Sequence, residues 1–135
     1  MAIDATREMT IEPAGWSAEA ESWLSQALTT GTIESLRRQH EAGAVLFYVR
    51  CEGATVGAFL LRVDDTPRGP QGVIVAAAAS MRGVDMVATC MPAIESRFVG
   101  VTSVRYHTAK PALARKLAAL GYAAREIVCV KDLQV

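Results

Sequence analysis

The stretch that decides the fold begins with the apolar run Val73-Ile74-Val75-Ala76-Ala77-Ala78-Ala79, which turns at Ser80-Met81-Arg82-Gly83. Seven consecutive residues without a polar side chain are typical of a strand that is buried on both faces. A strand of that kind lies inside a sheet rather than at its edge. The run therefore predicts a central strand, followed by a tight turn.

Helices and strands alternate after this turn. Apolar residues at helical spacing predict a helix that contains Pro92 and ends near Phe98, and its Glu95 is expected to face solvent. The alternating segment Ser103 to Thr108 predicts a strand. Pro111 is suited to the first position of a further helix, which Gly121 ends. A last strand is predicted at Ile127 to Val130.

The preceding half of the chain supplies two helices and a hairpin. Ser17 is a plausible cap for a helix that ends at Gly31, and Thr32 for a shorter one that ends at Gly43. The segments 44–50 and 54–63 read as two strands joined by Glu52-Gly53. Residues 64–70 are dense in turn formers and predict a surface loop. Residues 1–15 receive no defined structure.

Composition narrows the class of protein. The 135 residues form one expected domain, 1–135, with a mean hydropathy of +0.22 and 14 basic against 14 acidic residues. Zero net charge makes nucleic acid an unlikely partner, and no apolar run is long enough for a membrane span. The acidic start does not resemble a signal peptide, and three scattered cysteines predict neither metal site nor disulfide. A cytoplasmic protein is expected.

The order of elements resembles the GNAT fold of the GCN5-related N-acyltransferases. The resemblance rests on Ala76-Ala77-Ala78-Ala79 running into Arg82-Gly83-Val84, and on Ala114-Arg115-Lys116-Leu117-Ala118-Ala119-Leu120-Gly121-Tyr122. It implies a single α/β (α+β) domain, a mixed sheet flanked by helices in the order α-α-β-β-β-α-β-α-β. Short GNAT-like proteins of phages and prophages are the nearest in character, which would place the protein in the host cytoplasm or the virion.

The resemblance also implies a cofactor, acetyl-CoA or another acyl-CoA. Its arm would lie beside the central strand, and its pyrophosphate on backbone amides at the next helix start. The residues implied to bind it are Ala77, Ala79, Met81, Arg82, Gly83, Val84 and Asp85. The family loop reads Gln/Arg-x-x-Gly-x-Gly/Ala, and only Gly83 matches it. Because Asp85 puts a carboxylate where the pyrophosphate would sit, weak or absent binding is predicted.

The catalytic positions depart from the family as well. The central strand has no carboxylate to act as a base, and Leu117 occupies the position where the family often has a tyrosine acid. The remaining candidates are His107 and Ser80, with Tyr106 and Thr108 beside them. His107 is a candidate because histidine is a common acid or base in catalysis, although a strand histidine satisfied by a neighbour or by water is the favoured interpretation.

Three classes of function remain open. The first is N-acyl transfer from acyl-CoA to a small-molecule or protein amine, which needs proximity more than a strong acid or base. The second is a non-catalytic GNAT-like scaffold that binds a protein partner, such as a phage assembly or host-takeover protein. The third is nucleic-acid binding or modification through the basic cluster Arg105, Lys110, Arg115 and Lys116. The sequence leaves the oligomeric state open.

Overall fold

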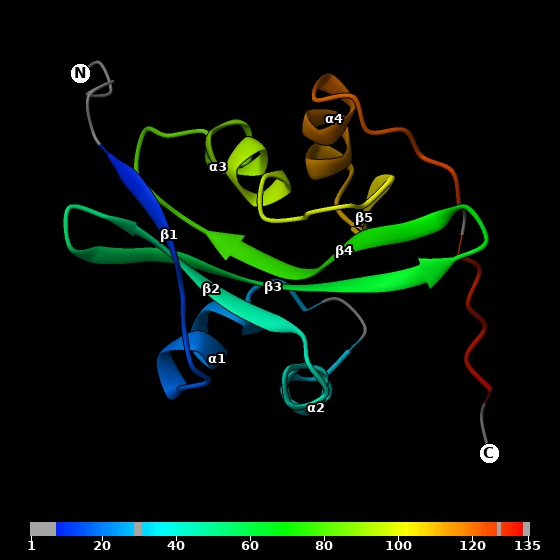
Figure 1. Ribbon diagram of the computed structural model, residues 1–135, viewed down its shortest axis with the longest axis horizontal. Coiled ribbons are helices and arrows are strands. Elements are labelled where there is room, and N and C mark those ends of the chain that lie inside the picture. Colours follow the sequence, from blue (N-terminus) through cyan, green and yellow to red (C-terminus); the bar gives the residue numbers. More distant parts are fainter. Residues whose placement is uncertain (1–7, 29–30, 127, 134–135) are drawn as a thin grey trace.

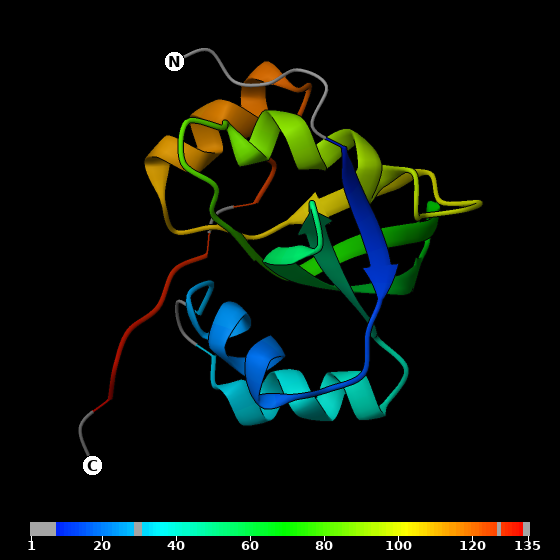
Figure 2. The same ribbon diagram turned by 90° about the vertical axis from the view of Figure 1, so that its left-hand side faces the viewer.

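A five-stranded sheet with two helices on each face forms the protein (Figures 1 and 2). The computed structural model describes residues 8–28, 31–126 and 128–133. The strands lie in the order β1-β2-β3-β4-β5, and only β4 and β5 are parallel. In chain order the elements are β1 (Met9–Pro13), α1 (Ala18–Ser25), α2 (Ile33–Glu41), β2 (Val45–Cys51), β3 (Ala54–Thr66), β4 (Gly69–Ala79), α3 (Met86–Glu95), β5 (Ser103–Tyr106) and α4 (Pro111–Ala119).

The first two helices begin where the sequence predicts. The Ser17 hydroxyl accepts a hydrogen bond from the Ala20 amide at 3.1 Å, and Thr32 caps α2 in the same way. The expected end of α1 at Gly31 was wrong. The helix ends at Ser25, because the following amides bond three residues back, Ala27 to Leu24 for example, which tightens the last turn.

The β2–β3 hairpin is confirmed, and its turn residues Glu52 and Gly53 both have positive φ, as a two-residue primed turn requires. The surface loop expected at 64–70 was wrong. The β3–β4 ladder continues to Thr66 opposite Gly69, and the Thr66 hydroxyl closes the turn by donating to the Gly69 carbonyl. Asp64 is tolerated within the strand because Arg62 and Arg105 both pair with it.

Strand β4 lies inside the sheet, as predicted. It pairs with β3 along almost its whole length but with β5 only at Gln71–Ile74. Ile74 is 2% exposed in the core under α3 and α4, and Ala76 is 5% exposed in the core over α1 and α2. The expectation that the whole run is buried was wrong at its end. Ala77 is half-buried and Ala79 exposed, because β5 does not continue beside them.

The second half also differs from prediction at its edges. Strand β1, in the segment left without structure, pairs with β2 as an edge strand. Strand β5 ends at Tyr106, two residues early. The last strand was wrong: Ile127 lies outside the described residues, and Val128 and Val130 are about three-quarters exposed without a strand partner among them. Alternating apolar residues form a strand only where a hydrogen-bonding neighbour exists.

Helices α3 and α4 cover one face of the sheet, where their core includes residues of β2, β3 and β4 (Figure 1). Pro92 lies inside α3, as predicted, and Pro111 is the first residue of α4. Gly121 ends the α4 region with a φ of 93°. Glu95 does not simply face solvent: it accepts a 2.5 Å hydrogen bond from the Tyr122 hydroxyl, which ties α3 to the end of α4.

Candidate functional site

A gap opens between β4 and β5 where their pairing stops. Tyr106, opposite Ile74, is the last paired residue of β5. At the same level the β3–β4 register shifts: Leu61 pairs with Ile74 and Leu60 with Ala76, which leaves Val75 extra. An extra residue bends and twists its strand. The backbone from Val75 to Ala79 therefore has a partner strand on the β3 side and none described on the β5 side.

A pocket of about 40 Å³ lies at the start of this gap. It is reached from both layers, since Ala27 comes from the end of α1 and Leu113 from α4. The remaining lining residues belong to β4 and to β5 with the loop after it: Val75, Ala76, Ala77, Tyr106, His107, Thr108 and Lys110. The pocket is therefore apolar on its β4 side and polar or basic on its β5 side.

The loop after β4 leads into the start of α3. Gly83 has a φ of 75°, a conformation that favours glycine. Asp85 caps α3: its Oδ1 accepts a hydrogen bond from the Ala88 amide at 3.3 Å. The same oxygen lies 3.5 Å from Lys116 Nζ on α4. The Ala88 amide, followed by the Lys116 charge, lowers the pKa of Asp85.

Asp85 thus occupies the position that a bound anion takes at a helix start. The first amides of a helix attract anions, and here one of them is already bonded to a carboxylate of the chain itself. Lys116 supplies a compensating charge across the gap between the two helices. The loop is consequently close to neutral at this point rather than simply repulsive to phosphate.

Several solved structures share the fold of this chain. The aminoglycoside N-acetyltransferase AAC(6')-Iy in complex with CoA aligns over 99% of this chain and 100% of its own, at 15% identity and a TM-score of 0.65. A predicted acetyltransferase of Clostridium acetobutylicum, solved with acetyl-CoA, aligns over 93% and 96%, at 14% identity and 0.66. Glucosamine-6-phosphate N-acetyltransferase of Arabidopsis thaliana aligns over 94% and 99%, at 17% identity and 0.56.

The chain has the GNAT fold. At these identities the likeness establishes the fold. The sequence itself matches no protein-family model and no curated protein.

The two catalytic candidates do not come together on this GNAT fold. His107 lines the pocket, whereas Ser80 does not. Ser80 lies six residues beyond Ile74, the partner of Tyr106, so about 20 Å of strand separates the two levels. The Ser80 amide donates to the Val56 carbonyl of β3 at 2.9 Å, which fixes the start of the loop. Burial raises the pKa of Tyr106, so its hydroxyl stays protonated at neutral pH.

The implied cofactor residues are spread along the gap. Ala77 lines the pocket, and Ala79 pairs with Gly57 at the end of the β3–β4 ladder. Met81 begins the turn, where its carbonyl accepts from the Val84 amide, and Arg82 and Gly83 follow. The set therefore forms a path from the pocket to the start of α3.

The basic cluster does not form one charged patch. Arg105 pairs with Asp64 at 3.0 Å, and Lys116 pairs with Asp85. Both charges are therefore offset within the fold, which weakens the case for a nucleic-acid surface. Lys110 belongs to the pocket instead. Its place there was missed because its neighbour across the gap, Ala27, is more than eighty residues away in the sequence.

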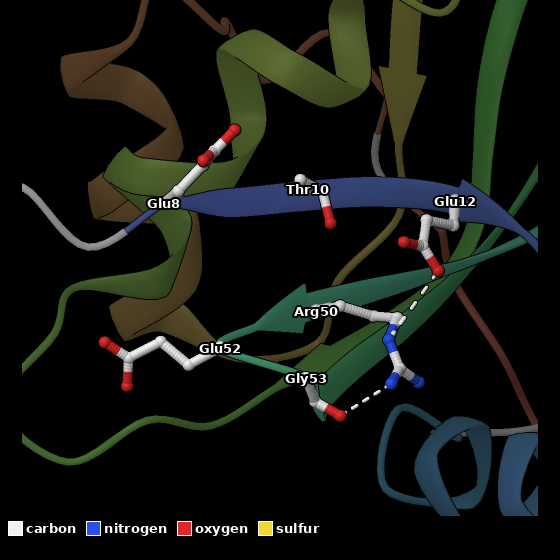
Figure 3. Close-up of a pocket in the computed structure, with 6 residues that line it drawn as sticks. All are labelled: Glu8, Thr10, Glu12, Arg50, Glu52 and Gly53. Carbon is white, nitrogen blue, oxygen red and sulfur yellow. Dashed lines mark hydrogen bonds and ion pairs between the residues drawn. The ribbon is translucent and has the colours of Figure 1, made fainter.

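A larger hollow of about 450 Å³ lies away from this gap, beside β1 and the β2–β3 turn (Figure 3). Arg50 lies at its centre, where it donates to the Gly53 carbonyl and pairs with Glu12. The other lining residues are Glu8, Thr10 and Glu52. It is an open surface on the outer edge of the sheet, and its one basic group is already engaged.

The described residues contain neither a metal-binding cluster nor a membrane-spanning helix. No group of three or more histidine, cysteine or acidic side chains is placed to hold a metal ion. The helices in the described part of the chain are all too short or too polar to cross a bilayer.

Proposed function

We propose that this chain is an N-acyltransferase that takes its acyl group from acyl-CoA. The observation that carries the proposal is the unpaired edge of β4. Backbone groups from Val75 to Ala79 face a gap instead of a strand, and the gap begins at a pocket and ends at a helix start. An extended arm with amide groups can bind such an edge as an added strand does.

The residues along the gap fit the two ends of such a molecule unequally. The pocket at Ala77 is apolar on the β4 side and suits an acyl group. The seat for a diphosphate at α3 suits it less, because Asp85 already accepts the Ala88 amide. Lys116 offsets the carboxylate, and Arg82 in the adjoining turn adds a second basic group.

Acyl transfer from a thioester to an amine needs few catalytic side chains. A bound acyl-CoA supplies an activated acyl thioester. The amine nitrogen forms a bond to the acyl carbon, the carbon–sulfur bond breaks, and the thiol leaves while the nitrogen gives up a proton. His107 lines the pocket, so we assign it the role of taking that proton, directly or through water. Positioning supplies most of the acceleration, so Ser80 needs no chemical role.

Calorimetry with acetyl-CoA tests the proposal. We expect wild-type protein to bind more weakly than about 1 μM, equivalent to roughly −8 kcal/mol. Asp85→Asn keeps a helix cap while it removes the negative charge, so affinity should rise several-fold. Asp85→Gly should do the same at a slightly lower stability. Glu34→Gln, an exposed acid in the first turn of α2, is the matched control and should change nothing.

A second candidate function is a scaffold that has lost its cofactor and binds a protein partner. The observation in its favour is again Asp85, which acts as a built-in anion at the helix start. Negligible binding of acetyl-CoA by wild type and by both Asp85 variants, with the fold intact, would select this function and reject the enzyme.

A further inference from the structure

We infer that the amine acceptor carries a negatively charged group, a phosphate or a carboxylate, and that Lys110 binds it. This inference rests on the proposed acyl transfer and names the substrate class for the same site. It starts from the charge of the pocket between β4 and β5. His107 and Lys110 line it, and among the residues that the structure describes no acid does.

The charge of Lys110 is available. Some basic side chains are engaged by the fold: Arg105 with Asp64, Lys116 with Asp85, and Arg97 with the Ile11 carbonyl. Lys110 has no ion-pair partner in the described part of the chain, although it lines a pocket. Its position is fixed by a local bond, since its amide donates to the Thr108 hydroxyl at 3.0 Å.

The opposite wall of the pocket adds no compensating charge. On this side the pocket is lined by Ala27, which follows α1 and carries no charge. The β4 wall contributes Val75, Ala76 and Ala77. A polycationic acceptor would therefore meet an uncompensated ammonium group here, whereas an amine with an anionic group would find a partner.

Lys110 and the loop before α3 would then bind two different anions, the charged group of the acceptor and the diphosphate of the cofactor. Lys116 and Arg82 lie with the loop at the far end of the gap, where the cofactor's diphosphate is expected. Lys110 lies at the pocket, where the acceptor is expected. A change at Lys110 should therefore alter the acceptor's KM and leave the KM for acetyl-CoA unchanged.

Binding can be tested without catalysis. Wild-type protein is titrated with 2-aminoethyl phosphate and, separately, with ethanolamine, while backbone amide resonances are followed by NMR. We expect the phosphate compound to shift residues 106–110 and to bind at least tenfold more tightly than ethanolamine. Lys110→Gln should abolish the difference. Arg115→Gln, an exposed change on α4 outside the pocket, should preserve it.

Activity provides the second test, with glucosamine 6-phosphate and glucosamine as a matched pair of acceptors. We expect kcat/KM to favour the phosphate by at least tenfold in wild type, and Lys110→Glu to reverse the preference. Transfer without any preference would overturn the inference and keep the proposed function. Phosphate-dependent binding at residues 106–110 without any transfer would keep the assignment of Lys110 as an anion-binding residue and would overturn the proposed function. Equal NMR binding of both compounds would overturn the inference directly.

Discussion

Strand β4 pairs with two neighbouring strands over very different lengths. Toward β3 it forms an antiparallel ladder from Gly69 to Ala79, interrupted only at Val75. Toward β5 it forms four parallel pairs and then none. On the first side every backbone group serves the fold. On the second, the free groups of Val75 to Ala79 are available to a ligand, so one strand carries both stability and function.

The difference should appear most strongly at two adjacent alanines. Ala76→Asp would place a carboxylate in the core over α1 and α2, where Ala76 is 5% exposed, at a cost above about 3 kcal/mol. Ala77→Asp faces the pocket and should cost only about 1 kcal/mol. Urea unfolding of both variants measures the contrast. Equal losses would show that the gap is as closed as the core.

The pairing of β3 with β4 can be weakened without introducing a charged side chain. A Cβ on Gly57 would lie 2.6 Å from Ala79 Cβ and 2.7 Å from the Ala78 carbonyl oxygen. Gly57→Ala should therefore push β3 from β4 at the end of the ladder and lower stability by about 1–3 kcal/mol. Gly15→Ala, with no atom within 4 Å of its new Cβ, is the control. A fully stable Gly57→Ala protein would contradict the close approach.

Beside the gap between β4 and β5, a contact between α3 and the end of α4 supplies stability where strand pairing is absent. The Tyr122–Glu95 hydrogen bond joins α4 to α3 above it, and burial, then Glu95, raises the pKa of Tyr122 above its ordinary value near 10. Tyr122→Phe should lower stability by about 1 kcal/mol near neutral pH.

The same bond gives a pH dependence of known sign. A tyrosine whose pKa is raised by folding stabilises the protein fully below its unfolded pKa, and that contribution is lost as pH rises above about 10. Denaturation at pH 7 to 11 should therefore show a steeper decline for wild type than for Tyr122→Phe. Parallel declines would mean that neither burial nor the bond to Glu95 raises the pKa of Tyr122 in solution.

The smallest effect should come from the β4–β5 ladder itself. Gln71 donates from its side chain to Ser103 at 3.0 Å across the parallel pair, but both are on the surface. Gln71→Ala should change stability by less than about 0.5 kcal/mol. Hydrogen exchange offers a sharper readout: amides of 103–106 should exchange faster than those of 58–63. Faster exchange at 58–63 than at 103–106 would show that the β4–β5 ladder is the more stable of the two sides of β4.

Local signals in the sequence predicted the fold well. The caps Ser17 and Thr32, the Glu52-Gly53 turn and the N1 proline Pro111 each act within a few residues, and all were confirmed. The apolar run correctly predicted β4 as an inner strand. Errors arose where a partner decides the outcome. Part of the segment 64–70 pairs in the β3–β4 ladder, because Asp64 is bound by two arginines. Val128 to Val130 form no strand, because no segment that the structure describes pairs with them.

The site was only partly predictable, for the same reason. His107 and Ala77 were expected and line the pocket, whereas Lys110 was expected only in a surface cluster. The pairing of Asp85 with Lys116 joins residues 31 positions apart and leaves no periodic trace. The extra residue Val75, which bends β4 beside the gap, lies within a run of similar side chains and cannot be distinguished there.

The spacing of strand partners along the chain also has a consequence for folding kinetics. Strands β2, β3 and β4 are joined by short turns, so their ladders close small loops and can form early. The parallel pair of β4 with β5 joins residues about thirty positions apart, with α3 between them. Pairs of higher contact order form more slowly. A folding intermediate with the β2–β3–β4 meander in place would expose the outer edge of β4 over its full length. In the folded protein β5 then covers this edge only from Gln71 to Ile74.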